Sequence, residues 1–469
     1  MVHPDSGYVG PPMDLGTAVL HRALRKGGDF AELFVEDRRS LSLRLEDRKV
    51  EDVVSGVDRG SSVRVVTGAS TRFGYVDAVD ELSLQSLAGR LSSGPNAHPG
   101  QMVPLGEEIA INRQPVLEAP ASVDSASKSD LLRLLDETAR SVSGEIRQVG
   151  AVYAESRQRV WVANSRGRFA TDDRTRVMVA VNVTAQRDGV MQTGRETLAH
   201  FGGYELFGVE AVRRLAREAA EKAVTMLSAS PAPAGRMPVI LANGFGGVLF
   251  HEACGHGLEA DYILKKTSVW EGKLGQRIAA DHVSAFDDGV GAGLWGSAGC
   301  DDEGTPCERT AVIEEGILTG YLTDLLRGER LGLRLTGNGR RQDYRHLPYP
   351  RMTNTYFGPG KASCADIIAD TPRALYAKSL SGGEVNPATG DFVFGVAEGY
   401  LIENGKVAAP VRGATLIGNG LEVLLAIDAI ADDLDVKAGM CGKEGQLVPV
   451  GSGQPTIRIR ELTVGGTSL

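Results

Sequence analysis

The sequence contains little cysteine, no long apolar run and no excess of basic charge. Five of its 469 residues are cysteine, and such an odd, sparse set argues against a disulfide scaffold and for a reducing compartment. No apolar stretch approaches the roughly 18 residues that a membrane helix needs, and the N-terminus lacks the basic and apolar regions of a secretion signal. The net charge is -9, whereas nucleic-acid-binding proteins usually carry a basic surface. We therefore predict a cytoplasmic protein that binds neither membranes nor nucleic acids.

The length of the chain favours more than one domain. A chain of 469 residues exceeds what one ordinary hydrophobic core organises, so two domains are expected. The clearest boundary lies at 228–235, where prolines and small residues replace apolar periodicity. We predict an N-terminal domain over residues 1–227, a linker at 228–236 and a C-terminal domain over 237–469.

Apolar periodicity predicts an α+β fold. Helical spacing occurs over 128–142 and 208–227, whereas residues 31–74 and 149–183 alternate apolar and polar positions as antiparallel strands do. A turn is expected at 57–60. Beyond the linker the sequence is rich in glycine and in strand-like segments, with few long helical patterns. We expect an N-terminal mixed α/β domain with antiparallel strands and a β-rich C-terminal domain that carries a metal-binding helix.

The pattern His251-Glu252-x-x-x-His256 is the strongest sign of chemistry in the sequence. Zinc proteases use His-Glu-x-x-His, where the two imidazoles share one helix face and the glutamate acts as general base. Here the spacing is five residues, which in an ideal α-helix leaves the side chains about 140° apart. A local i→i+5 bulge or a break would bring the imidazoles together, and Gly255 and Gly257 lower the cost of such a distortion. The alternative is that the two histidines are unrelated.

Zinc needs a third protein ligand and an open position for water. Cys441 is a candidate because it lies in the glycine-rich segment 438–446, which we expect to form a tight loop that presents a thiolate. Glu259, one helical turn after His256, is a rival, whereas Cys254 is expected to be a buried core residue. The remaining candidates are Asp261 and His282. The residues alone leave this choice open.

Several segments of the chain resemble one known family. The segment 243–259, which contains both histidines, and four others resemble the signatures of the TldD/PmbA metallopeptidases. The four others are 337–340, 351–355, 395–400 and 440–446. The alternating segment 37–74 resembles the opening domain of that family, so the resemblance covers nearly the whole chain.

The resemblance implies an activity, a cofactor and a partner. The family has a subunit that carries the His-Glu-x-x-x-His motif and a relative that lacks it, and this chain resembles the first, TldD-like kind. It implies that Zn²⁺ is bound by His251, His256 and Cys441, with Glu252 as general base. It also implies a peptidase that admits unfolded or leader-type peptides to an enclosed cavity between subunits. The assembly would be a homodimer or a heterodimer with a metal-free PmbA/TldE-like relative.

Substrate contacts are harder to predict. Asn338, Arg351 and Asn354 lie in the motif segments and are candidate substrate-binding residues, although asparagine is also common in turns. Residues 327–351 contain seven arginines against two acids, so this stretch is a candidate for holding a peptide carboxylate or acidic side chains. Its alternative is a solvated surface. Two other functions stay open: a peptide-binding, chaperone-like partner subunit without catalysis, and a metal-dependent amidohydrolase of another substrate.

Overall fold

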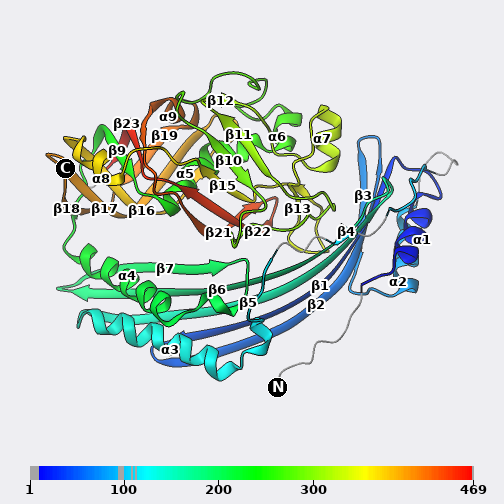
Figure 1. The fold of residues 1–469 in the computed structure, drawn as a ribbon, viewed down its shortest axis with the longest axis horizontal. Helices are drawn as coiled ribbons and strands as arrows, with labels where there is room; N and C mark the ends of the chain where they lie inside the picture. Colours follow the sequence, from blue (N-terminus) through cyan, green and yellow to red (C-terminus); the bar gives the residue numbers. More distant parts are fainter. Residues whose placement is uncertain (1–9, 93–99, 107–108, 111–113, 467–469) are drawn as a thin grey trace.

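Seven strands between residues 30 and 200 build one long, curved sheet, which lies in the lower part of Figure 1. The computed structural model describes residues 10–92, 100–106, 109–110 and 114–466. Within them the strand order is β3-β2-β1-β5-β6-β4, with β7 alongside β6. The strands are β1 (Phe30–Glu46), β2 (Lys49–Thr67), β3 (Ser70–Val76), β4 (Ile109–Ala110), β5 (Ile146–Asn164), β6 (Phe169–Arg187) and β7 (Val190–His200).

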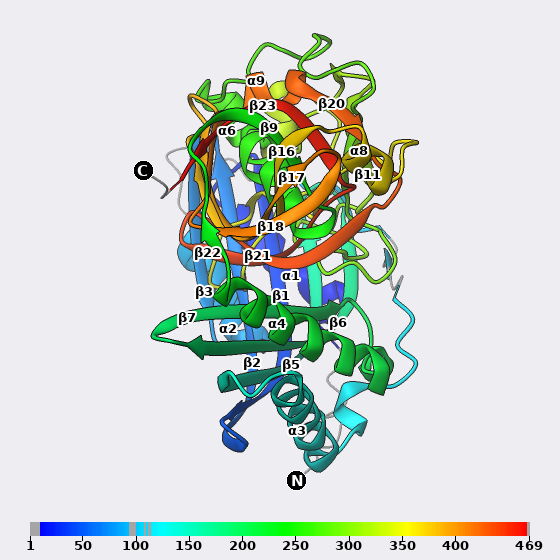
Figure 2. The ribbon, with the colours of Figure 1, turned by 90° about the vertical axis from the view of Figure 1, so that its left-hand side faces the viewer.

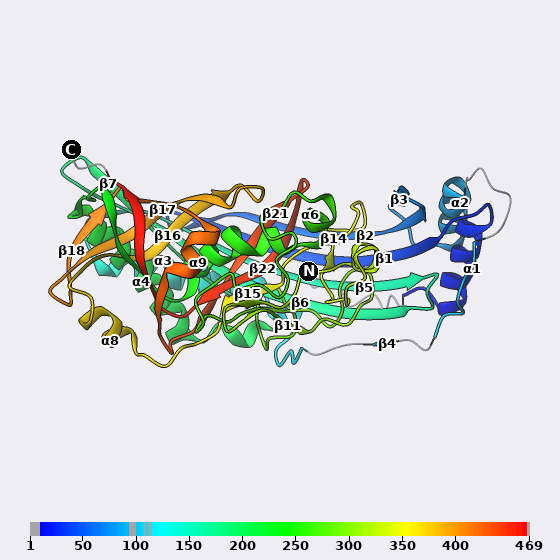
Figure 3. The same ribbon diagram turned by 90° about the horizontal axis from the view of Figure 1, so that it is seen from above.

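Helices cover one face of this sheet at its two ends (Figures 1 and 3). The helices are α1 (Met13–Leu24), α2 (Glu81–Leu91), α3 (Ser125–Val142) and α4 (Val209–Leu227). Because strand side chains alternate between faces, Val177, Val179 and Val181 of β6 are buried in the core that α3 and α4 complete. Arg174 and Arg176 of the same strand point to the opposite face and contact the C-terminal half of the chain.

The C-terminal half is a β-rich body that lies over the other face of the long sheet (Figure 2). One sheet has the order β12-β11-β10-β15-β22-β21, and a larger one has the order β16-β9-β23-β19-β17-β18-β8, with β20 beside β23. The first contains β10 (Ala285–Asp288), β11 (Arg309–Glu314), β12 (Ile317–Leu318), β15 (Asn354–Phe357), β21 (Asp435–Lys443) and β22 (Gln446–Gln454). The second contains β8 (Ser230–Pro231), β9 (Gly235–Leu241), β16 (Arg373–Val385), β17 (Asp391–Glu403), β18 (Lys406–Arg412), β19 (Thr415–Asn419), β20 (Ile427–Ile430) and β23 (Ile457–Gly465).

Short helices and one small hairpin complete the C-terminal half. The hairpin pairs β13 (Gly339–Arg340) with β14 (Tyr349–Pro350). The helices are α5 (Val248–Phe250), α6 (Ala260–Lys265), α7 (Leu325–Leu331), α8 (Cys364–Ala369) and α9 (Gly420–Ala426). Phe250 of α5 is fully buried in the main core, which also includes Leu241 of β9 and Phe357 of β15. This core fixes the helix that carries the predicted histidines between the two sheets.

The α+β fold class with a β-rich C-terminal half is confirmed, but one turn was predicted wrongly. β2 runs without interruption through 57–60, and the chain reverses instead at Asp47 and Arg48, both with positive φ. The charged residues at 57–60 are accommodated in the strand because Arg59 pairs with Asp37 on β1 at 2.7 Å. The predicted linker 228–236 contains β8 and the start of β9, and the division into two domains at this segment stays a prediction.

Buried ion pairs join the long sheet to the C-terminal half. Glu32 of β1 accepts from Arg341 at 2.5 Å, and Arg64 of β2 donates to Glu303 at 2.6 Å. Arg174 of β6 donates to Asp302 at 2.7 Å. Removing one partner of such a buried pair usually costs about 3–5 kcal/mol because the other charge is left uncompensated. These contacts therefore hold the two halves in one fixed orientation.

The described helices give no support for a membrane-spanning segment. Each of them is too short or too polar to cross a bilayer. The first nine residues, which bear on the predicted absence of a secretion signal, lie outside the described residues.

Candidate metal centre

A distorted helix brings His251 and His256 together. Residues 244–258 form one helical run whose middle, His251–Gly255, is a π-helical turn. The N–H of His256 donates to the carbonyl oxygen of His251, which is an i→i+5 bond and the first of the two distortions that the five-residue spacing predicts. The two imidazole rings have centroids 5.1 Å apart and planes at 86°. The extra residue in the turn thus corrects the angle that an ideal α-helix would leave between them.

The two glycines beside His256 have a different role from the predicted one. Neither has a positive φ, so backbone freedom is not what the helix uses there. A Cβ atom at Gly255 would lie 2.2 Å from the sulfur of Met352, and one at Gly257 would lie 2.4 Å from the ring of Trp270. Glycine is needed because buried side chains pack directly against this helix.

Cys441 reaches the histidines from a different part of the chain. Its Sγ lies 3.5 Å from Nε2 of His256. One ligand atom from each of His251, His256 and Cys441 lies within 4.8 Å of the others, and all three residues are buried. Among the described residues no other His, Cys, Asp or Glu group converges in this way. Cys441 was expected in a loop but lies in β21, whose pairing with β22 fixes the direction of its side chain.

A second layer of polar groups orients both imidazoles. Nδ1 of His251 lies 3.3 Å from Oγ1 of Thr355, and Nδ1 of His256 lies 3.0 Å from Oε2 of Glu259. Nζ of Lys443 holds Glu259 at 2.9 Å and Asp261 at 2.7 Å. Metal-binding histidines usually donate their second N–H to a carboxylate, a carbonyl or water, which fixes the ring and its tautomer. The Nε2 atom of His256, which faces Cys441, is then free to bind a metal.

The contacts of the five candidate residues show which of them can be the third metal ligand, a choice that the sequence alone left open. Glu259 pairs with Lys443 and contacts the Nδ1 atom of His256, so it lies directly behind that imidazole, whereas Asp261 pairs with Lys443 and contacts neither histidine. Cys254 is fully buried in the apolar core, where burial raises the pKa of its thiol. His282 is partly exposed, and its ring lies 3.4 Å from Asp281. Cys441 is the only one of the five candidates whose ligand atom joins the two histidines.

Thr355 and Lys443 were not predicted from the sequence, although both lie in segments that the family resemblance singled out. Lys443 follows Cys441 by two residues, and side chains two apart on a strand share one face. That spacing would have indicated Lys443 had the strand been recognised. Nothing in the sequence pairs Thr355 with His251, because the two residues are 104 positions apart.

The electrostatics of the site favour a thiolate at Cys441. Burial opposes ionisation, but the neighbouring His251 and His256 hold the pKa of the Cys441 thiol well below its usual value. Burial likewise opposes protonation of His256, yet the Glu259 carboxylate raises the pKa of this imidazole well above its usual value. The thiolate is the form of cysteine that binds metal ions. A metal ion entering the site would replace the imidazole proton as the positive partner of that thiolate.

Glu252 lies at the open side of the three ligand residues. Its Oε2 is 3.9 Å from Nε2 of His256, and its side chain is 22% exposed, whereas His256 is 10% exposed. It is not a member of the converging ligand set. The carboxylate is therefore adjacent to the position where a ligand ion would sit and remains accessible to water.

The three candidate substrate-binding residues are buried. Asn338, Arg351 and Asn354 have at most 1% of their surface exposed. Asn338 donates to Asp287 at 2.7 Å, Asn354 donates to the carbonyl oxygen of Asp288, and Arg351 donates to the carbonyl oxygen of Cys441. In this conformation their side chains hold the loops around the metal-ligand residues and do not face open space. Direct contact with a substrate, as predicted, would require these loops to move.

Replacing Glu259 by glutamine tests this second layer. The amide keeps the size of the side chain but removes the charge that orients His256 and pairs with Lys443. Loss of such outer partners typically lowers metal affinity about 10–100-fold, so we expect a fall of that size in competition titrations with a chelating dye. Glu271→Gln, at an exposed position, should leave the affinity unchanged. Equal affinities for Glu259→Gln and wild type would contradict the orienting role.

Comparison with known proteins matches most of the chain to one family. Family models for the PmbA/TldA metallopeptidase match domain 1 at residues 31–93, the central domain at 118–227 and the C-terminal domain at 234–466. A "Metalloprotease TldD homolog" of Haemophilus influenzae is 39% identical over 94% of this chain and 93% of its own length. A "Zinc metalloprotease TldD homolog" of Saccharolobus solfataricus is 28% identical over 95% of this chain and 99% of its own length.

A solved structure shares the fold. The crystal structure of TldE from Thermococcus kodakarensis superposes with a TM-score of 0.78 at 18% sequence identity. The match covers 96% of this chain and 100% of that chain. At this identity the likeness concerns the fold alone.

Proposed function

The chain belongs to the PmbA/TldD family of metallopeptidases, and on that premise we propose that it is a zinc-dependent peptidase of unfolded or leader-type peptides. The metallopeptidase class follows from the family models and from relatives that are named metalloproteases. The identity of the metal, the roles of the site residues and the class of peptide are proposals. These proposals rest on the convergence of His251, His256 and Cys441.

The spacing of the ligand atoms supports zinc. An ion with bonds of about 2.0–2.1 Å to nitrogen and 2.3 Å to sulfur, at a tetrahedral angle, separates those two atoms by roughly 3.6 Å. The Nε2 atom of His256 and the Sγ atom of Cys441 are 3.5 Å apart. Two imidazoles and one thiolate form a set that zinc favours, and three protein ligands leave the open position of a catalytic site. His251, His256 and Cys441 would hold the ion.

The chain's own residues supply the proton transfers. When bound, the ion supplies Lewis-acid chemistry, polarising a carbonyl group and acidifying water. Glu252 accepts the proton of the attacking water and passes it to the nitrogen of the leaving amine. Glu259 and Thr355 keep the imidazole rings in place while the charge in the site changes.

An extended peptide has a strand edge beside the ligand residues. β21, which carries Cys441, is the last strand of its sheet and pairs only with β22 among the described strands. A peptide added to such an edge is held mainly by backbone hydrogen bonds, so binding depends little on its sequence. This edge suits unfolded chains and excludes folded ones.

A partner subunit forms part of the proposal. The shared fold with a protein named TldE supports assembly with a metal-free relative, and a homodimer is the other possibility. In either case the enclosed cavity that admits unfolded chains would lie between the subunits.

Cleavage of one protein in two states tests the proposed substrate class. We expect the zinc-loaded chain, alone or with its metal-free relative, to cleave a reduced and alkylated protein but not the native form of that protein. Treatment with a chelator should remove the activity, and stoichiometric zinc should restore it. Cleavage of small amides at a higher kcat/KM than unfolded chains would favour the amidohydrolase. Activity that is indifferent to chelation would exclude the metal-dependent reaction.

A further inference from the structure

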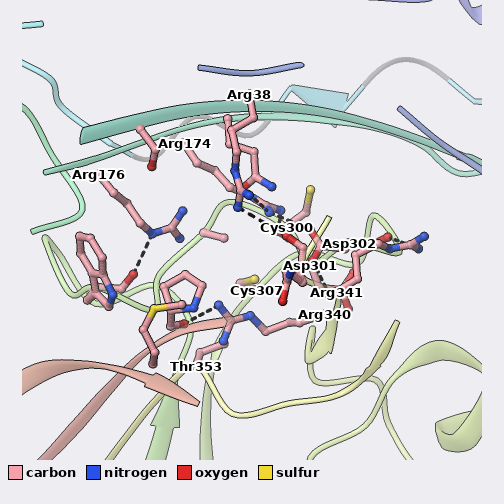
Figure 4. Close-up of a pocket in the computed structure, with 17 residues that line it drawn as sticks. Arg38, Arg174, Arg176, Cys300, Asp301, Asp302, Cys307, Arg340, Arg341 and Thr353 are labelled. Atoms are coloured by element: carbon pink, nitrogen blue, oxygen red, sulfur yellow. Dashed lines mark hydrogen bonds and ion pairs between the residues drawn. The ribbon is translucent and has the colours of Figure 1, made fainter. Parts of the chain in front are cut away.

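A cavity rich in arginine separates the long sheet from the C-terminal half. Its volume is about 130 Å³, roughly ten times the smallest volume that holds one water molecule. Arg38, Arg174 and Arg176 enter it from the sheet, and Arg340 enters from the opposite side (Figure 4). The register of β1, β5 and β6 aligns Arg38 with Gln158 and Gln158 with Arg174, so these side chains lie on one face.

Part of this charge is neutralised within the protein. Arg174 pairs with Asp172 at 2.8 Å and with Asp302 at 2.7 Å, and Arg341 pairs with Glu32. The other acid in the wall, Asp301, accepts only from backbone N–H groups. The acids that line the cavity are therefore occupied.

Arg176 and Arg340 have no carboxylate partner among the described residues. Nε and Nη2 of Arg176 donate to the carbonyl oxygens of Trp295 and Ser297 at 2.9 and 2.8 Å. Arg340 donates to the carbonyl oxygens of Met352 and Pro449. Each guanidinium carries five N–H donors, so donors remain on both. The two groups approach the same space from opposite sides (Figure 4).

Such an arrangement is costly without an anion. Arg176 is 6% exposed and Arg340 is 7% exposed. The carbonyl oxygens and, for Arg176, the Phe201 ring 5.0 Å away replace only part of the lost hydration, because none of them carries a full negative charge. Burial, together with the charges of Arg174 and Arg340, lowers the pKa of Arg176 to about 9. The excess of positive charge occurs in a chain whose net charge is -9. An anion between the two guanidinium groups would compensate these buried positive charges.

The cavity lies beside β21, the strand that carries Cys441. Its wall includes Met440, whose side chain projects from the face of β21 opposite to that of Cys441 because neighbouring strand residues alternate, and Thr353, two residues before Thr355. Adjacent Cα atoms are about 3.8 Å apart, so a peptide that passes β21 at Cys441 is within a few residues of the cavity.

We propose that Arg176 and Arg340 form a subsite that binds a carboxylate of the peptide substrate. This proposal rests on the peptidase function for the identity of the ligand, but not for the presence of an anion site. The carboxylate comes either from the C-terminus of the peptide or from an aspartate or glutamate side chain. Guanidinium groups bind carboxylates through two parallel N–H···O bonds, which fixes the position of the bound group as well as its charge.

Equilibrium binding tests the subsite without relying on turnover. The probe is a fluorescein-labelled hexa-alanine in three forms: with a free C-terminus, with a C-terminal amide, and as the amide with one internal aspartate, placed at each position in turn. Affinities are measured by fluorescence anisotropy on the full-length, zinc-loaded Glu252→Gln protein. We expect the free acid or one aspartate peptide to bind about 10–100-fold more tightly than the neutral amide, which is the size expected of hydrogen bonds between charged groups. The peptide form that binds more tightly than the neutral amide identifies the source of the carboxylate.

Substitutions then locate the binding site. Arg176→Gln and, separately, Arg340→Gln in the same background should remove the difference between the acidic peptide and the neutral amide. Arg334→Gln, which replaces an arginine of the same stretch at an exposed position, should keep it. Circular dichroism and the melting temperature show whether each variant is folded, and the comparison of the three peptides on the parent protein needs no cavity variant at all.

The outcomes separate the two proposals. Equal binding of all three peptide forms, or a preference that survives both cavity substitutions, would overturn the subsite. A preference that depends on Arg176 and Arg340 in a protein that cleaves no peptide would leave the anion site standing and reject the peptidase proposal. Cleavage of peptides without any preference for a carboxylate would support the peptidase proposal and reject the subsite.

Discussion

Glu252→Gln is expected to reduce kcat for peptide cleavage by about 10²–10⁴-fold, the usual contribution of a general acid–base residue. The amide has nearly the same shape as the carboxylate but cannot accept a proton from water. Glu252 does not belong to the ligand set of His251, His256 and Cys441, so the zinc content should stay stoichiometric. The measurement is single-substrate kinetics beside metal analysis of the same preparation.

The combination of results decides what Glu252 does. Low activity with full zinc content is what a general base predicts. Low activity with lost zinc would make Glu252 a ligand, and activity within tenfold of wild type would exclude it as the base.

Cys441→Ser is expected to empty the metal site and, with it, remove activity. The neighbouring imidazoles hold Cys441 as a thiolate despite its burial, whereas a serine hydroxyl stays protonated near neutral pH and is a poor zinc ligand. The loss of affinity should exceed the roughly 10–100-fold typical of outer-sphere changes. His256→Ala should behave in the same way. The measurement is zinc content after dialysis against a weak chelator, with peptide cleavage measured alongside.

Cys364→Ser is the matched control for this substitution. Cys364 is the least buried of the five cysteines, and it is not part of the ligand set. Its replacement should leave zinc content and activity unchanged. Stoichiometric zinc in a folded Cys441→Ser protein would move the third ligand to another group, of which Glu259 is the nearest to His256.

Local features of the site were predictable from the sequence, and its distant contacts were not. If both histidines bind one ion, the spacing of His251 and His256 calls for either an i→i+5 bulge or a break in the helix, and the His256 N–H bond to the His251 carbonyl shows the bulge. Cys441 was one of five ligand candidates from the residues and was singled out only by resemblance to the family. It lies 185 positions from His256, and no periodic pattern encodes a contact of that range.

The errors have a common physical cause. The glycines around Cys441 suggested a loop, but pairing with β22 makes the segment a strand, because cross-strand hydrogen bonds outweigh a weak local preference. The turn expected at 57–60 failed for the same reason, since pairing of β2 with β1 continues through it. Substrate contact by Asn338 and Arg351 stays a prediction; in this conformation both side chains hold buried loops.

The function of the arginine-rich stretch 327–351 also depended on the three-dimensional fold. The sequence showed an excess of positive charge but could not tell a solvated surface from a binding site. In the structure Arg330 and Arg334 are exposed, whereas Arg340 and Arg341 line a cavity against β6. The buried counter-charge of Arg341 is Glu32 of the long sheet, 309 positions away, and no local pattern reveals that pairing.

The proposed metal centre is a zinc ion bound by two imidazoles and the sulfur of Cys441, and X-ray absorption at the zinc edge measures that coordination directly. For the purified wild-type protein we predict one sulfur at about 2.3 Å together with nitrogen or oxygen neighbours at about 2.0–2.1 Å, and loss of the sulfur contribution in any zinc that Cys441→Ser retains. A first shell of nitrogen and oxygen alone in the wild-type protein would contradict the proposed metal centre.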